Sequence, residues 1–331
     1  LELTQERIAS DGGEIPITGN TQVRSRTLNG SEWSGMTESF FTVAGQSPQA
    51  ATDVVVGEIH YNPSGTSEGT EVIEVLNIGP RPVNLRGARF VDGVEFTFPR
   101  RRDTVLPSGA RMVLAGNLHK MNAGYGLGVE VGGLYSGRLN NLGERLRVED
   151  EGGLQLADLT FGDTAPWPLA PDGAGPSLVM IDPDSGADPN NPFAWRSSTV
   201  AGGTPGWDDA VAFTGDPDGD DDGDGLNNLL DHALANSPER GESGVVVSLE
   251  LHDNGSGAES FLTVRHRANL VDPGLRFRVE TSRDLVNWRS TGASELVERV
   301  EQGDGTATLT WRSTQPLDPA VPCEFIRLVV A

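Results

Sequence analysis

Apolar and polar residues alternate along much of the chain in short runs that are typical of β-strands. Residues 21–26 and 38–43 alternate in this way on either side of a tight turn predicted at Asn29-Gly30. Because successive strand side chains point to opposite faces, this alternation predicts strands with one buried face. Seven more short strands, divided by Gly, Pro and Asn turns, are predicted at 54–60, 71–77, 94–98, 111–115, 145–150, 154–161 and 177–182.

The last quarter of the chain repeats the strand pattern after one helical segment. Residues 226–235 place apolar side chains at spacings of three and four, which predicts a short helix that ends at Ser237-Pro238. Strands are then predicted at 245–251, 261–265, 277–280, 307–311 and 325–329. This number of strands suffices for a second, small sandwich.

The composition agrees with an all-β chain of more than one domain. The sequence has 331 residues, with 42 Gly, 21 Pro and 36% hydrophobic residues, which suits short strands joined by many turns. Its one cysteine, Cys323, excludes an internal disulfide. The cores, together with any bound metal, must therefore hold the domains together.

The charge argues against nucleic acid as a partner, and the length of the apolar runs argues against membrane insertion. With 48 acidic residues against 25 Lys and Arg, the net charge is −23, so the surface would repel nucleic acid. The longest basic cluster, residues 100–102, is followed at once by Asp103. No apolar run reaches the roughly 18–20 residues that span a bilayer, so no membrane insertion is expected.

An aspartate-rich segment carries the clearest chemical signal. Residues 208–231 hold nine Asp and neither Lys nor Arg, and oxygen donors at alternate positions followed by glycine suit a Ca²⁺ loop. If Asp218 were loop position 1, position 12 would be Leu229, which cannot coordinate. A start at Asp220 makes every position usable, so the predicted ligands are Asp220, Asp222, Asp224, the Leu226 carbonyl, Asn228 and Asp231. The extra acids Asp216, Asp218 and Asp221 either hold a second Ca²⁺ with Asp222 or are solvated.

This loop resembles the calcium loops of dockerins and of thrombospondin type 3-like linkers in bacterial surface proteins, which also continue into a short helix. It departs from the EF-hand pattern at position 12, where Asp231 replaces the usual glutamate. A calcium dissociation constant of about 10⁻⁶ to 10⁻³ M would suit an extracellular module. We therefore expect an exported protein.

A second resemblance covers roughly residues 54–207. The segments 57–63 (GEIHYNP), 71–77 (EVIEVLN), 83–87 (VNLRG) and 106–109 (LPSG) resemble the lamin-tail domain as it occurs in bacteria. Later segments fit the same order, at 139–144, 177–178, Trp195 and 203–206. The resemblance implies an immunoglobulin-like β-sandwich with no known catalytic centre.

The two ends of the chain resemble further β-modules. Residues 1–46 resemble the last strands of a fibronectin type III or immunoglobulin-like module, and 243–331 resemble the C-terminal β-sandwich of large bacterial exported proteins. The predicted fold is all-β, with tandem immunoglobulin-like β-sandwiches joined by a short calcium-binding loop-helix. The predicted domains are 1–46, 54–207, 208–240 and 243–331.

Catalytic motifs are missing from the sequence. There is no HExxH pair, nucleophile elbow or P-loop, so we expect no enzymatic activity. Glu58, His60 and Tyr61 could form a polar site, but the alternation favours an ordinary surface pair of Glu58 and His60. The Pro- and Gly-rich stretch 165–192 is either a ligand-binding surface loop or a decorative insertion.

The function that these patterns favour is a non-catalytic, calcium-stabilised structural or adhesive module of a bacterial exported multidomain protein, located extracellularly or at the cell surface. Its partner would be a protein or a glycan, and exposed edges of the N-terminal strands could mediate self-association. The alternative is the accessory region of a secreted enzyme, a hydrolase or spore-coat-type kinase, whose catalytic domain precedes residue 1.

Overall fold

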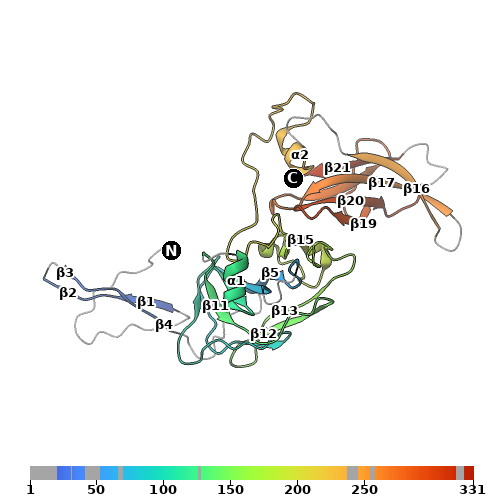
Figure 1. Cartoon of the computed structure of the whole chain (residues 1–331). Coiled ribbons are helices and arrows are strands. Elements are labelled where there is room, and N and C mark those ends of the chain that lie inside the picture. Colours follow the sequence, from blue (N-terminus) through green and yellow to red (C-terminus); the bar gives the residue numbers. More distant parts are fainter. Residues whose placement is uncertain are drawn as a thin grey trace.

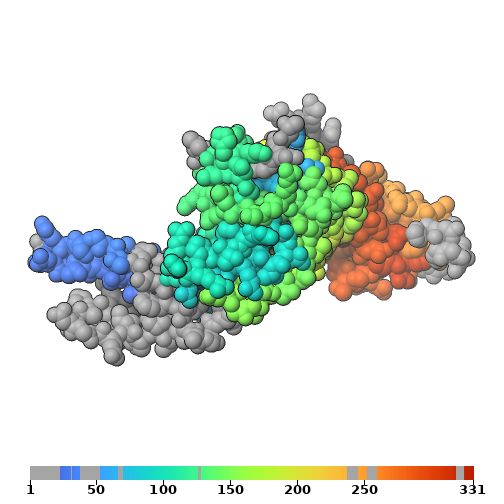
Figure 2. Space-filling model, turned by 60° about the horizontal axis from the view of Figure 1, so that its bottom comes forward, coloured from blue at the N-terminus to red at the C-terminus, as the bar shows by residue number. Residues whose placement is uncertain are grey.

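The computed structural model describes residues 21–30, 32–41, 53–65, 70–125, 128–236, 245–253, 258–317 and 324–331. These residues form a hairpin, a central sandwich and a C-terminal sandwich, in sequence order along the molecule (Figures 1 and 2). The predicted all-β fold is confirmed. Among the described residues, no helix has the length and apolar character needed to cross a membrane.

The N-terminal hairpin has two pairs of strands. β1 (Thr21–Ser25) pairs antiparallel with β4 (Thr37–Phe41), and β2 (Leu28–Asn29) pairs with β3 (Glu32–Trp33). Residues 1–20 and 42–52 lie outside the described residues. The assignment of 1–46 to the end of a larger module, and self-association through its edges, therefore stay predictions.

Two sheets face each other in the central sandwich. The larger has the order β11-β10-β6-β5-β14-β15 and the smaller the order β13-β12-β8, while β7 and β9 form a separate pair. Among the strand pairs of the described residues, β10 and β11 alone run parallel. The larger sheet comprises β5 (Val54–His60), β6 (Val72–Asn77), β10 (Arg111–Ala115), β11 (Val131–Leu134), β14 (Leu178–Met180) and β15 (Trp195–Ser197). The other strands are β7 (Val83–Asn84), β8 (Arg89–Asp92), β9 (Val105–Leu106), β12 (Gly143–Glu149) and β13 (Gln155–Gly162).

Apolar side chains of both sheets fill one core, which includes Ile59, Tyr61, Leu114, Leu146 and the fully buried Trp195. The strand predicted at 94–98 is not observed. Phe96 and Phe98 instead stack edge to face at 4.8 Å, and this segment makes only isolated bridges to neighbouring chain. A packed aromatic corner therefore replaces the strand.

The outer face of the larger sheet is covered as well, which the alternation did not predict. Helix α1 (Leu118–Tyr125) lies on it, and Met121 packs against Val72 and Val113 (Figure 1). The register of β5 against β6 shifts at Gly57, so Glu58 and His60 fall on this outer face. Both are only 2% exposed, so the predicted surface pair is wrong.

The C-terminal sandwich combines a four-stranded sheet, ordered β16-β17-β20-β19, with the pair β18-β21. Their core contains Ala268, Leu270, Ala307 and Leu309. The strands are β16 (Val246–Asp253), β17 (Ala258–Asn269), β18 (Phe277–Ser282), β19 (Ser294–Glu301), β20 (Thr306–Ser313) and β21 (Phe325–Val330). The charged strand β19 was not predicted. The short helices η1 (Pro183–Ser185) and η2 (Pro192–Ala194) lie in the connection between β14 and β15, and α2 (Asn228–Ala233) precedes the C-terminal sandwich in the chain.

Candidate functional site

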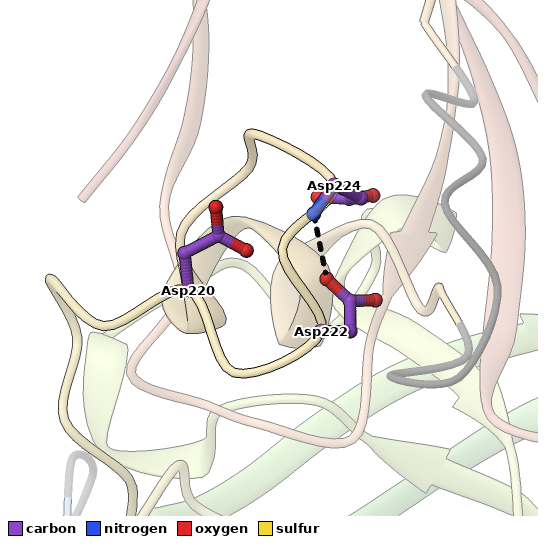
Figure 3. A group of neighbouring side chains, drawn as sticks. All are labelled: Asp220, Asp222 and Asp224. Atoms are coloured by element: carbon purple, nitrogen blue, oxygen red, sulfur yellow. Dashed lines mark hydrogen bonds between the residues drawn. The ribbon is translucent and has the colours of Figure 1, made fainter.

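Three of the predicted ligands meet in the loop before α2. Asp220, Asp222 and Asp224 each offer a carboxylate oxygen, and these oxygens lie within 4.8 Å of one another. Figure 3 shows Asp220 facing the other two across the coil of the loop. Gly223 and Gly225 adopt φ of +73° and +93°, conformations that favour glycine and allow the chain to wrap around the acids.

Backbone N–H groups of the loop hold the three carboxylates in place. Asp220 accepts from Gly223 at 2.8 Å and from Gly225 at 3.1 Å. Asp222 accepts from the N–H of Asp224 at 3.2 Å, and Asp224 accepts from Leu226 at 2.8 Å. These bonds between side chains and the backbone are typical of Asx turns, and they make the loop compact without the help of an ion.

Asp231 approaches the same loop from helix α2. It is 7% exposed, and its carboxylate accepts from the Asn236 amide at 3.2 Å. Burial raises the pKa of Asp231, and the negative charges of Asp224, Asp222 and Asp220 raise it further. The helix therefore adds a fourth carboxylate to a region of concentrated negative charge, but within the described residues Asp231 is not among the three converging carboxylates, and its ligation at loop position 12 stays a prediction.

Asn228 has a different role in the structure. Its Oδ1 accepts from the N–H of Asp221 at 3.1 Å, and its Nδ2 donates to the Asp216 carbonyl at 3.1 Å. Both polar atoms thus close the base of the loop, and ligation by Asn228 would require exchanging one of these bonds. Ligation by the Leu226 carbonyl stays a prediction. Within the described residues, Asp216, Asp218 and Asp221 do not join the three converging carboxylates.

Helix α2 rests on the C-terminal sandwich, and Asp272 is the anchor. Its Oδ2 lies 3.0 Å from Nε2 of His232 on the helix and accepts from the N–H of Phe213 in the linker at 2.7 Å. The rings of Phe213 and His232 pack at 5.3 Å. Because Asp272 is only 6% exposed, one buried carboxylate holds both the linker and the helix.

A buried ion pair joins the two sandwiches directly. Arg299 of β19 donates to the carbonyl of Phe193 at 2.9 Å and to the carbonyl of Trp195. Glu301 pairs with Arg299 and accepts from the N–H and the hydroxyl of Ser197 at 2.8 and 2.9 Å. The side chains of Arg299 and Glu301 are 4% and 7% exposed. Figure 1 shows β15 and β19 facing each other at this junction.

Two buried glutamates close the outer face of the larger sheet. Glu58 accepts from the Ser177 hydroxyl at 2.6 Å and from the N–H of Thr204 at 2.8 Å. Glu74 accepts from Arg111 at 2.7 Å and from the N–H of Gly206 at 2.7 Å. Burial raises the pKa of Glu58 to about 7 and also raises that of Glu74. The glycine-rich motif 203–206 therefore serves to bind these two carboxylates.

His60 completes this face. Its Nδ1 bonds to the hydroxyl of Tyr125 at the end of α1, and burial lowers the pKa of His60 to about 4. The imidazole is therefore neutral at pH 7. The alternation of residues in β5 could not show that His60 lies beneath α1, because the sequence analysis predicted no helix at that place.

Comparison with known protein families agrees with the central part of this structure. The sheet arrangement defines the class, an immunoglobulin-like β-sandwich of structural type. Residues 47–158, about one third of the 331-residue chain, match the family model of the lamin tail domain. No curated protein matches the chain. The match ends within β13 of the smaller sheet, whereas β14 and β15, which follow it in the chain, belong to the larger sheet of the same sandwich.

Proposed function

We propose that the chain is a non-catalytic, calcium-stabilised structural module that acts outside the cell or at its surface and presents the lamin-tail sandwich to a protein or glycan partner. The observation that supports it best is the pair of buried junctions. Asp272 holds the linker and helix α2, while Arg299 and Glu301 hold the two sandwiches together. Buried charged contacts of this kind fix a relative orientation, as a rigid spacer requires.

The converging carboxylates support a Ca²⁺ site. Calcium bonds to oxygen at about 2.3–2.6 Å, so ligands in one shell lie at most about 5 Å apart. The spacing within 4.8 Å of Asp220, Asp222 and Asp224 fits that limit, and Asp231 would approach from the helix. A bound ion would neutralise the mutual repulsion of these acids and fasten the loop to α2. Because α2 rests on the C-terminal sandwich, the ion would also stiffen the connection between the sandwiches.

The extracellular assignment follows from the expected affinity. A site in which three carboxylates of one loop converge should bind in the micromolar to millimolar range, which extracellular calcium fills and cytosolic calcium does not. The net charge of −23 also suits a solvated surface in that setting.

Calorimetric Ca²⁺ titration of the full chain, combined with limited proteolysis, tests this function. We expect about one ion per chain and protection of 208–236 from cleavage, and both effects should disappear in Asp224→Ala. Asp218→Asn is the matched control, because it removes a charge from the same loop but lies outside the converging group. If wild type shows neither heat nor protection at millimolar Ca²⁺, the calcium proposal fails.

A further inference from the structure

Strand β16 lies at one edge of the four-stranded sheet in the C-terminal sandwich. It is eight residues long, and within the part of the chain that the structure describes it pairs with β17 and with no other strand. Its second side therefore presents backbone N–H and C=O groups without strand partners, which is a template for pairing with a further strand. Figure 1 shows β16 on the side of this sandwich that faces away from the central sandwich. A partner could reach this edge without disturbing the junction of the two sandwiches.

The side chains of β16 are strongly apolar although the strand is at an edge. Val246, Val247, Leu249 and Leu251 are between 54% and 75% exposed. The last three alternate along the strand and therefore share one face. On the neighbouring strand the same face is buried at Val264, which lies opposite Val247. The apolar face of the sheet thus continues onto β16 but is exposed there, and exposed apolar rows of this kind mark interaction surfaces.

The opposite edge of the same sheet is protected against such pairing. Strand β19 is rich in charged residues, and a register shift interrupts its pairing with β20. Charges and bulges are the features by which edge strands avoid pairing with other chains. The central sandwich also packs against this strand through Arg299 and Glu301. In contrast, the segment 246–251 of β16 has one charged residue, Glu250, so it lacks these features.

We propose that β16 pairs antiparallel with β16 of a second copy of the chain. When Leu249 lies opposite Leu249 of the second copy, Val247 falls opposite Leu251, so each apolar side chain of the row meets another. Glu250 falls opposite Ser248, so the register keeps the two glutamates from facing each other, where like charges would be destabilising. The pairing would add about six backbone hydrogen bonds. It would unite two four-stranded sheets into one continuous sheet about a two-fold axis.

A second copy is favoured over an unrelated partner because this register makes the strand complementary to itself in both packing and charge. The net charge of −23 opposes association of two copies, but salt screens distant charges over about 8 Å at physiological ionic strength. A contact made by one pair of strands falls near or below the roughly 1,200 Å² that marks the low end of stable interfaces, so we expect a dissociation constant of about 10–100 µM. This contact goes beyond the calcium function and does not depend on it.

Sedimentation velocity of the full chain, in EDTA and at about 1 to 300 µM, tests the dimer. We expect an equilibrium of monomer and dimer, with a dissociation constant that falls several-fold when salt is raised from about 0.05 to 0.5 M, because the repulsion between copies is screened. Leu249→Lys should weaken the dimer about tenfold or more, since it opposes two like charges at the centre of the pairing. Val286→Lys is the matched control, because Val286 is 78% exposed in the loop after β18 of the same sandwich.

Disulfide crosslinking tests the register. In a Cys323→Ser background, which removes the one native cysteine, Leu249→Cys should form a covalent dimer on mild oxidation, because directly opposite Cβ atoms lie about 4.5–5.5 Å apart. Leu251→Cys should crosslink at least about tenfold more slowly, because its counterpart in the second copy would lie about 13 Å away along the strand.

Three results would overturn the proposal. The first is a monomer at about 300 µM chain in 0.5 M salt, which would leave this edge to a different protein. The second is normal dimerisation by Leu249→Lys, which would place the contact elsewhere, for example on the N-terminal hairpin. The third is equal crosslinking of Leu249→Cys and Leu251→Cys. Asp224→Ala should dimerise like wild type while losing calcium, so failure of the calcium function and failure of the dimer are distinguishable.

Discussion

Replacing Glu301 with glutamine should uncouple the two sandwiches. Glu301 and Gln have the same shape, so the substitution removes the charge and leaves the packing volume nearly unchanged. In the structure the carboxylate accepts two hydrogen bonds from Ser197 and pairs with Arg299, which also reaches the carbonyls of Phe193 and Trp195. The bonds to Ser197 and to the two carbonyls cross from one sandwich to the other. The ion pair of Glu301 with Arg299 holds in place the two side chains that make these bonds.

The free energy of docking that Glu301→Gln should remove can be worked out from the burial of these groups. Hydrogen bonds to a charged group contribute about 1.5–3 kcal/mol and neutral ones about 0.5–1.5 kcal/mol, so the two bonds from Ser197 should each weaken by about 1 kcal/mol. Arg299, with only 4% of its side chain exposed, would also lose its counter-charge. Removing one partner of a buried pair costs about 3–5 kcal/mol, which would weaken docking of the sandwiches by a factor of roughly 10² to 4 × 10³.

Differential scanning calorimetry and small-angle X-ray scattering measure this effect. Wild type should unfold with coupled sandwiches, whereas Glu301→Gln should show a separate, lower transition and a larger radius of gyration. The control is Glu295→Gln on the same strand, where the carboxylate is 50% exposed and pairs with Arg312. A surface pair contributes at most about 1 kcal/mol. If the two variants behaved alike, the buried pair would not be what joins the sandwiches.

Four further predictions concern the interior and the loop. Because the folded-state pKa of Glu58 is raised from 4.5 to about 7, stability should fall by about 3 kcal/mol as pH rises through that interval; Glu58→Gln should remove this fall in denaturant titrations. The pKa of His60 is lowered from 6.5 to about 4, so stability should fall as pH drops through that interval, and His60→Gln should reduce the acid-side loss in the same titrations. Gly203→Ala should lower the melting temperature more than Gly202→Ala, because both sites have positive φ but a Cβ at Gly203 would lie 2.6 Å from the Ser177 hydroxyl and also meet Glu58; equal losses would contradict this steric explanation. Asp231→Asn should raise stability in EDTA at pH 7, since the raised pKa shows that ionisation is unfavourable there, and should weaken Ca²⁺ binding in calorimetry.

Local pattern predicted most of the strands because their signal is short-range. The strands at 54–60 and 111–115 have the predicted bounds, and the short helix falls inside the predicted 226–235. The convergence of Asp220, Asp222 and Asp224 also followed from spacing alone, since one turn of chain brings them together. In contrast, 94–98 has strand-like alternation but forms an aromatic corner, because packing of Phe96 on Phe98 outweighs strand pairing.

The amino-acid sequence by itself determined the all-β class and the acidic loop, since these depend on local periodicity and composition. The tertiary structure decided which polar groups are buried. Glu58 and His60 become interior groups only because α1 and the 203–206 motif, distant in sequence, cover the second face of β5. The same holds for Glu301, whose partner Ser197 is about a hundred residues away. Contacts of such separation depend on which surfaces meet after folding, and the local alternation of residues carries no information about them.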